Sequence, residues 1–239
     1  MISILIPAYN EATRIADTIR SVRAVELPAD VEIVVVDDGS NDNTAQVAEK
    51  AGADTVLRKS NGGKGAALNA GLQLSTGEFL VLLDADLGSS AAEFAKLIAP
   101  VLSGEADMTI ATFPERPGRG GGMGLVVRLA RWGIDKLTGR QMRAPISGQR
   151  ALKRSVLLST GGFASGWGVE IGLTVRALRS GFTVLEVATD MDHRVTGRSY
   201  ADILHRAAQL WAAAIVLIDL WLHTRPALPP PARETPRHG

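Results

Sequence analysis

The sequence predicts a single α/β domain built on a mainly parallel β-sheet. Short β-branched apolar runs alternate with segments of helical periodicity through the first half of the chain, which is the pattern of successive βαβ units. The length of 239 residues suits one domain with a short tail. Hydrophobic residues make up 46% and charged residues 21%, so an ordinary globular protein is expected rather than a coiled coil or a disordered chain.

The first half is expected to contain most of the sheet. Strands are expected at residues 2–6, 31–36, 55–57, 79–83 and 108–112, and helices at 11–25, 43–51, 65–74 and 91–102. The first helix follows from Ile15, Ile19 and Val22, which repeat at helical spacing. The run 31–36 is apolar almost throughout, as in a strand that is buried on both faces of a sheet.

The second half of the chain is less regular. A loop rich in Gly and Arg at 114–124 opens it, and we place a soft boundary near residue 113. Helices are expected at 124–137, 168–180 and 199–222, and short strands at 149–153 and 183–187. The last segment, 223–239, carries five of the 11 prolines and is expected to be disordered.

The composition limits which binding partners and which cellular location are expected. Lys and Arg number 26 and Asp and Glu 25, so the net charge of +1 gives no field that favours nucleic acid. The absence of Cys excludes a disulfide framework and a thiolate metal site, and it suits the cytoplasm. The N-terminal apolar run is too short for the core of a signal peptide. The apolar stretch 207–222 is broken by Gln209 and Asp219, so a buried or interfacial helix is expected there rather than a membrane span.

Polar residues follow three of the predicted strands. They lie at 7–11 (PAYNE), 37–40 (DDGS) and 84–86 (DAD). Ligands of open parallel sheets bind beyond the carboxyl ends of the strands. The three segments are therefore expected to line one cleft.

Asp84 and Asp86 suggest a metal site. A turn after the buried run FLVLL would bring the two carboxylates together, and hard oxygen ligands suit Mg²⁺ or Mn²⁺. The alternative is that one carboxylate caps the following helix and the other faces solvent. The buried strand before the pair favours the metal.

Two further segments have both a structural and a functional interpretation. Asp37 and Asp38 suit a turn before Gly39, and they equally suit hydrogen bonds to a base or a ribose. The run 61–65 (NGGKG) leads into a helix, and its glycines also allow close approach of a ligand, with Lys64 near phosphate. The run lacks the Gly-Lys-Ser/Thr ending of a P-loop, and no G-x-G-x-x-G follows a strand, so a dinucleotide oxidoreductase is not expected.

Four motifs in order resemble the family 2 glycosyltransferases with the GT-A fold. They are ILIPAYNEA (4–12), VVVDDGSNDNT (34–44), NGGKGAALNAGL (61–72) and FLVLLDADL (79–87). Segments 147–150 (SGQR), 168–187 and 193–199 (HRVTGRS) resemble the dolichyl-phosphate mannose synthases and their bacterial polyprenyl-phosphate relatives. The resemblance covers about residues 1–210. It implies one GT-A domain over 1–222, with a nucleotide-sugar half at 1–113 and an acceptor half at 114–222.

On the donor side, the resemblance implies a nucleotide-binding set and a metal. The nucleotide-binding set is Pro7, Tyr9, Glu11, Asp38, Lys64, Gly65 and Asp84. Within it, Asp38 would hold the base or its ribose, and Lys64 and Gly65 would line the base or the ribose. Asp84 and Asp86 would hold Mg²⁺ or Mn²⁺, with Asp86 the more direct ligand.

On the acceptor side, the resemblance implies roles for four residues of the second half. Glu170 would lie near the acceptor, as a general base or as a group that binds hydroxyls, and a surface helix position is the alternative. Arg194 and Arg198 belong to a segment that in relatives closes over the diphosphate or an acceptor phosphate. His193 would be a metal ligand, as in some soluble relatives, or a loop histidine paired with a neighbouring aspartate. Asp86, Glu170, Arg194 and Arg198 form the expected catalytic set.

Three residues depart from the mannose synthase pattern. Gly88 stands where that branch often has Gln, Ala144 where it often has Asp, and Gln149 where it has Phe. These differences weaken the case for mannose and for a dolichol-type acceptor. They leave the donor chemistry unchanged.

The expected function is that of a metal-dependent glycosyltransferase (a hexosyltransferase). It would move a sugar from a nucleotide-sugar donor, with a UDP-sugar favoured, to a polyprenyl phosphate or another phosphate or hydroxyl acceptor. A transferase for a small soluble acceptor of the glycerate type is the alternative, and a non-catalytic nucleotide-sugar-binding protein is a remote one. A sugar-1-phosphate nucleotidyltransferase would need a Gly-rich loop with Arg after the first strand, where this chain has 7–11 (PAYNE). We expect a cytoplasmic protein with weak or no membrane association, at most peripheral at the inner face of the membrane. The sequence leaves open whether the protein forms a homodimer.

Overall fold

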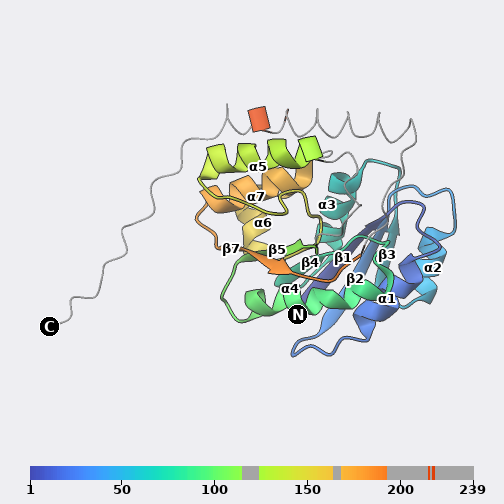
Figure 1. Ribbon diagram of the computed structural model, residues 1–239. Coiled ribbons are helices and arrows are strands. Elements are labelled where there is room, and N and C mark those ends of the chain that lie inside the picture. Colours follow the sequence, from blue (N-terminus) through green and yellow to red (C-terminus); the bar gives the residue numbers. More distant parts are fainter. Residues whose placement is uncertain (115–123, 164–167, 193–214, 216, 219–239) are drawn as a thin grey trace.

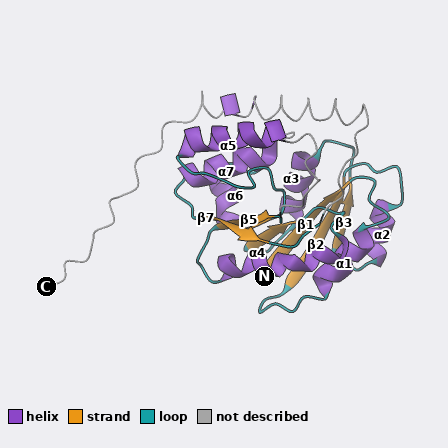
Figure 2. Ribbon diagram, viewed as in Figure 1, coloured by secondary structure: helices purple, strands orange, loops and turns teal. Residues whose placement is uncertain are grey.

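The computed structural model describes residues 1–114, 124–163, 168–192, 215, 217 and 218. Its centre is a seven-stranded β-sheet with helices on both faces (Figure 1, Figure 2). The strand order is β3-β2-β1-β4-β6-β5-β7. The predicted α/β architecture with a mainly parallel sheet is confirmed.

The elements lie close to their predicted positions. The strands are β1 (Ile2–Ala8), β2 (Val31–Asp37), β3 (Thr55–Arg58), β4 (Phe79–Leu82), β5 (Met108–Thr112), β6 (Arg150–Lys153) and β7 (Val184–Ala188). The helices are α1 (Ile15–Arg23), α2 (Thr44–Lys50), α3 (Lys64–Leu74), α4 (Phe94–Leu102), α5 (Gly124–Thr138), α6 (Arg154–Thr160) and α7 (Val169–Arg179), with the 3-10 helix η1 (Gly88–Glu93) before α4. The sequence did not predict α6.

Strand direction brings distant segments to one edge of the sheet. β3, β2, β1 and β4 are parallel neighbours, so their carboxyl ends meet, with Ala8 opposite Asp37 and Leu82 opposite Leu5. β6 runs antiparallel between β4 and β5, so its first residue, Arg150, lies opposite Leu82 at the end of β4. The loop that precedes β6 therefore reaches the same edge. The sheet is continuous across residue 113, since β6 lies between two strands of the first half.

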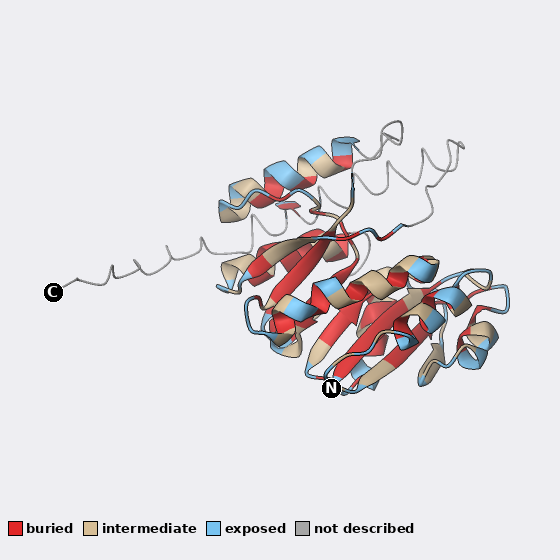
Figure 3. Cartoon of the chain, turned by 60° about the horizontal axis from the view of Figure 1, so that its bottom comes forward, coloured by how far each residue is buried: buried red, intermediate tan, exposed pale blue. Residues whose placement is uncertain are grey.

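Two apolar layers cover the sheet. Leu5 faces one layer, which contains Leu68 of α3 and Ile171 of α7 together with side chains of α5 and α6. Ile4, the next residue toward the N-terminus, faces the other layer, which contains Ile19 of α1 and side chains of α2, η1 and α4. Figure 3 shows the strands as the most deeply buried part of the chain. Strands buried on both faces give the edge a rigid frame.

The C-terminal region is described at three positions. Residues 215, 217 and 218 are helical, and they fall within the helix expected at 199–222. Leu217 is buried and packs on Gly133 of α5, whereas Ile215 and Ile218 are exposed. The rest of that helix and the expected disordered tail lie outside the described residues. Among the described residues, none of the helices combines the length and the apolar character that a membrane span requires.

Candidate functional site

The ends of β1 and β2 are tied together by hydrogen bonds. Asn10, which has a φ of 56°, donates its N–H to Ser40 Oγ (2.9 Å) and accepts the N–H of Asn41 at its side-chain oxygen (2.8 Å). The N–H of Glu11 donates to Thr44 Oγ1 at the start of α2 (2.9 Å). The segments after these two strands therefore form one rim, as predicted.

Three residues expected near the nucleotide lie on this rim or next to it. Tyr9 follows β1 and is 48% exposed, and Pro7 near the end of β1 is half-buried. Gly65 is buried in the first turn of α3. Their positions suit the predicted contacts with a nucleotide, which remain predictions.

Asp38 holds the loop in front of α3. Its side chain is almost fully buried and accepts hydrogen bonds from Lys59 Nζ (2.7 Å) and from the N–H groups of Gly62 (2.9 Å) and Gly63 (2.7 Å). Gly39 follows with a φ of 81°, and a Cβ at that position would lie 2.8 Å from the backbone N of Asn61. Asp38 thus shapes the loop that leads to Lys64, a role that the sequence did not predict. The predicted contact of Asp38 with a base or ribose remains a prediction.

The turn 84–86 follows β4 and is held by α1. Thr18 is fully buried; its Oγ1 donates to the carbonyl of Ala85 (2.8 Å) and accepts the N–H of the first residue of η1 (2.8 Å). Arg14 Nη1 donates to the carbonyl of Asp86 (3.2 Å). A turn therefore follows β4, and its backbone is held by Thr18 of α1 and by Arg14 just before that helix. The predicted meeting of the two carboxylates at a metal remains a prediction.

Lys64 joins two carboxylates that come from different halves of the chain. Its Nζ lies 2.8 Å from Asp84 Oδ1 and 3.2 Å from Glu170 Oε1. Burial by itself would lower the pKa of Lys64, but the two carboxylates outweigh burial and raise that pKa above its ordinary value. Glu170 lies in the first turn of α7 with its side chain only 14% exposed, so it faces this site and not the solvent.

Gln149 is a second hydrogen-bond partner of Asp84. Its side chain is buried, and its Nε2 donates to Asp84 Oδ2 while its Oε1 accepts from Ser147 Oγ (3.3 Å). Together with Lys64, it provides a donor to each oxygen of Asp84. The sequence offered one signal for this residue, the Gln in SGQR where the resembling enzymes have Phe. It did not reveal the partner.

Arg150 fixes the loop that carries Gln149. The guanidinium is fully buried and donates to the carbonyl of Ser147 from Nε (2.8 Å), to Thr174 Oγ1 from Nη1 (2.8 Å) and to the carbonyl of Pro145 from Nη2 (3.4 Å). Burial lowers the pKa of Arg150 to about 10, against the opposing field of two nearby glutamates. Arg150 is therefore charged at neutral pH and links the loop to α7.

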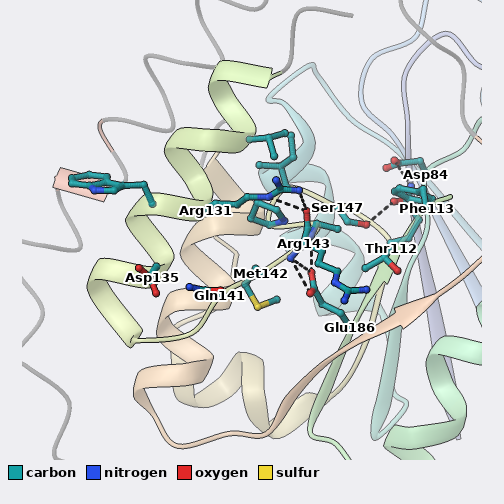
Figure 4. A pocket seen from close by; sticks show the side chains of 17 residues that line it. Asp84, Thr112, Phe113, Arg131, Asp135, Gln141, Met142, Arg143, Ser147 and Glu186 are labelled. Carbon is teal, nitrogen blue, oxygen red and sulfur yellow. Dashed lines mark hydrogen bonds between the residues drawn. The ribbon is translucent and has the colours of Figure 1, made fainter. Parts of the chain in front are cut away.

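A pocket of about 1170 Å³ opens from Asp84 toward α5. Figure 4 shows Asp84 and Asp135 at opposite ends of it. The backbone N–H of Arg143 donates to both oxygens of Glu186 (2.8 and 2.9 Å), and the carbonyl of Arg143 accepts from Arg131 Nε (3.2 Å). Apart from Asp84 and residues 112–113 at the end of β5, the lining comes from the half of the chain that was expected to bind the acceptor.

The carboxylates of the turn suit a divalent metal. Asp84 and Asp86 offer hard oxygen donors, and Mg²⁺ usually takes one or two protein carboxylates while water and phosphate complete its coordination. Within the described part of the chain, no group of three or more His, Asp or Glu side chains is arranged around a metal position. The third predicted ligand, His193, and the predicted Arg194 and Arg198 lie outside the described residues.

Several proteins of similar sequence or structure are sugar transferases. The glucosyl-3-phosphoglycerate synthase of Mycobacterium tuberculosis (strain ATCC 25618 / H37Rv) is 33% identical over 195 residues, which cover 73% of this chain and 60% of that protein. A crystal structure of the M. tuberculosis synthase in complex with Mn²⁺, UDP-glucose and phosphoglyceric acid has a TM-score of 0.74 at 28% identity, and the match covers 92% of this chain and 79% of the other. The undecaprenyl-phosphate 4-deoxy-4-formamido-L-arabinose transferase of Pseudomonas fluorescens (strain SBW25) is 37% identical over 105 residues, 41% of this chain and 31% of that protein.

The match to the curated synthase is thus partial in length, since it spans three-fifths of that protein. A family model described as glycosyl transferase family 2 matches residues 3–165, well over half of the chain. The motifs that suggested the family lie inside this match, and so do the turn 84–86 and Gln149. The chain belongs to glycosyl transferase family 2.

Proposed function

We propose that the protein is a metal-dependent glycosyltransferase that moves a sugar from a UDP-sugar to an acceptor with a phosphate or hydroxyl group. The observation that carries the proposal is the turn 84–86, which lies at the carboxyl edge of the sheet beside Lys64, with Asp84 at one end of a large pocket. A donor on the rim and an acceptor in the pocket would meet at this turn. Relatives solved with UDP-glucose and phosphoglyceric acid support this arrangement.

The residues present suit the chemistry of the donor. Asp84 and Asp86 would hold Mg²⁺ or Mn²⁺, which stabilises the negative charge on the leaving nucleoside diphosphate. Lys64 adds a fixed positive charge beside Asp84. Structures of the M. tuberculosis synthase with UDP and either Mn²⁺ or Mg²⁺ support the same metals and nucleotide here.

Glu170 is proposed to act on the acceptor. Its carboxylate lies beside Lys64, which also contacts Asp84, and a carboxylate at this place can accept a hydrogen bond or a proton from an acceptor hydroxyl. An acceptor phosphate is already anionic and would need no base. Arg194 and Arg198 keep their predicted roles toward phosphate, and His193 keeps its predicted role toward the metal.

Between the two acceptor classes, we favour a small phosphorylated hydroxy acid over a polyprenyl phosphate. The sequence match to the glucosyl-3-phosphoglycerate synthase covers 73% of this chain, whereas the match to the undecaprenyl-phosphate enzyme covers 41%. The pocket wall also carries the exposed guanidinium of Arg143, which suits an anionic group. The expected location is the cytoplasm, where such acceptors are dissolved.

Substitution of Asp86 tests the proposal. We expect Asp86→Ala to abolish transfer from UDP-glucose to phosphoglycerate and to abolish the Mn²⁺-dependent rise in melting temperature with UDP, because one of two metal carboxylates is lost. The matched control is Asp17→Ala, which removes an exposed aspartate on α1. Calorimetry of the wild type should show tighter binding of UDP than of guanosine diphosphate. Near-normal transfer without added metal, or by the Asp86→Ala variant, contradicts the proposal.

A further inference from the structure

We propose that Gln149 is a positioning residue that, together with Lys64, aims the carboxylate of Asp84 at the metal and the donor diphosphate. This inference rests on the proposed function and deepens it. It gives a function to Gln149, which stands where the mannose synthases have Phe. Neither Gln149 nor Lys64 needs to touch the metal for this task.

The fold brings Gln149 to Asp84 through the antiparallel course of β6. Because Arg150 pairs with Leu82, the residue before β6 lies beside the residues that follow β4. Gln149 is 2% exposed there, with Nε2 bonded to Asp84 Oδ2 and Oε1 bonded to Ser147. Both ends of the amide are thus engaged, which fixes the direction of its donor.

A neutral donor suits this position better than an aromatic ring or a second cation. A Phe side chain has no donor for a carboxylate, whereas an added lysine would neutralise the charge that attracts a metal. Asp84 and Glu170 carry two negative charges, and the shared Lys64 carries one positive charge. The cluster therefore keeps a net negative charge for a divalent cation while both oxygens of Asp84 are oriented.

Gly148 keeps the path of Lys64 open. A Cβ at Gly148 would lie 2.4 Å from Lys64 Nζ and 3.4 and 3.5 Å from the two oxygens of Asp84. A methyl group would therefore push the ammonium away from its two carboxylates. Gly148→Ala therefore tests the contacts of Lys64 without changing Lys64, Asp84 or Glu170 themselves.

The experiment measures metal affinity separately from stability. The dissociation constant of Mn²⁺ is determined in the presence of UDP by electron paramagnetic resonance, and melting temperature is measured without metal. We expect Gln149→Met, which keeps the length and loses the amide, to weaken Mn²⁺ binding by about tenfold or more, as the loss of outer-shell partners generally does. Gly148→Ala should weaken Mn²⁺ binding in the same direction. Gln73→Met, the same change at an exposed position of α3, is the matched control and should leave the affinity unchanged.

The outcomes separate the inference from the proposed function. Wild-type affinity for Mn²⁺ in Gln149→Met, with a lower melting temperature, would mean that Gln149 only fills the core, and the inference would be wrong while the proposed function stood. If the wild type bound no Mn²⁺ with UDP, the proposed function itself would fail. Where Gln149→Met does not fold, Gln149→Asn carries the same test, because it keeps the amide but is one methylene too short to reach Asp84.

Discussion

Arg150 shows how a single buried charge organises the site. Its three hydrogen bonds end on two carbonyls of the loop before β6 and on Thr174 of α7. The loop carries Gln149, and α7 carries Glu170. One guanidinium therefore holds together the segments that surround Asp84.

We expect Arg150→Lys to destabilise the protein by about 2–4 kcal/mol, because an ammonium cannot serve three acceptors spread around a planar fork and leaves buried acceptors unpaired. Urea unfolding measures the difference. The matched control is Arg20→Lys at an exposed pair with Asp17, where a change within about 0.5 kcal/mol is expected. Equal stability of the two variants would show that the fork geometry of Arg150 is unimportant.

The sequence predicted several site residues but few of their partners. Asp84, Asp86 and Lys64 were predicted because acidic strand ends and a Gly-rich loop are local patterns. The contact of Lys64 with Glu170 depends on where α7 lies relative to α3, and no local pattern carries that information. Gln149 was noticed only as a departure from a motif.

At the scale of elements, Glu32 connects β2 to β1 and to the segment before β4. Its Oε1 accepts hydrogen bonds from Ser3 Oγ on β1 (2.5 Å) and from the backbone N–H groups of Thr76 (2.6 Å) and Gly77 (3.2 Å) before β4. Burial would raise the pKa of Glu32, but these hydrogen bonds outweigh it and lower that pKa below its ordinary value. The carboxylate thus joins three neighbouring segments of the sheet.

This contact makes stability depend on pH. The folded pKa of Glu32 is below the unfolded value, so the stabilisation is present above the unfolded pKa of about 4.3 and is lost as pH falls through the folded pKa. We expect Glu32→Gln to lower the free energy of unfolding by about 1–2 kcal/mol at pH 7 and by much less at pH 3. Urea unfolding at both values, with Glu49→Gln on the exposed face of α2 as control, tests this. A loss of equal size at both pH values contradicts it.

Elements were predicted well where one local signal sufficed. The apolar runs of β1, β2 and β4 are long enough to predict buried strands. The direction of β6 was not predictable from its four residues, because the sequence of a short strand does not indicate whether it pairs in parallel or antiparallel. That direction is what brings Gln149 to the site.

At the scale of the whole molecule, the two halves share one sheet. β6 lies between β4 and β5, and Lys64 spans from α3 to α7. The boundary expected near residue 113 therefore divides the expected donor and acceptor functions along the sequence. It does not divide the structure into two hydrophobic cores. The residues proposed for the donor and those proposed for the acceptor are therefore positioned by the same sheet.

The C-terminal segment bears on membrane association. A Cβ at Gly133 would lie 2.4 Å from Leu217 Cδ2, so Leu217 packs closely on α5 and uses its apolar side chain within its own domain. Trp132, Ile215 and Ile218 remain exposed, each by about half or more. The net charge of +1 gives little attraction to anionic lipid. The packing of Leu217 and the low net charge support the expectation of weak or no membrane association, whereas the three exposed apolar side chains are the surface that a lipid would contact.

Sedimentation with anionic liposomes tests this last expectation. We expect the full chain to stay in the supernatant at physiological salt, and a truncation after residue 206 to melt at a lower temperature because the packing of Leu217 on α5 is lost. Ile218→Glu places a charge on the exposed side of the C-terminal helix, and Leu158→Glu on α6 is the matched control, since Leu158 is 73% exposed. Strong pelleting of the wild type that Ile218→Glu abolishes and Leu158→Glu retains would show that the C-terminal helix binds lipid. That result would turn the choice of acceptor back toward a polyprenyl phosphate, because the helix would then hold the pocket next to the membrane.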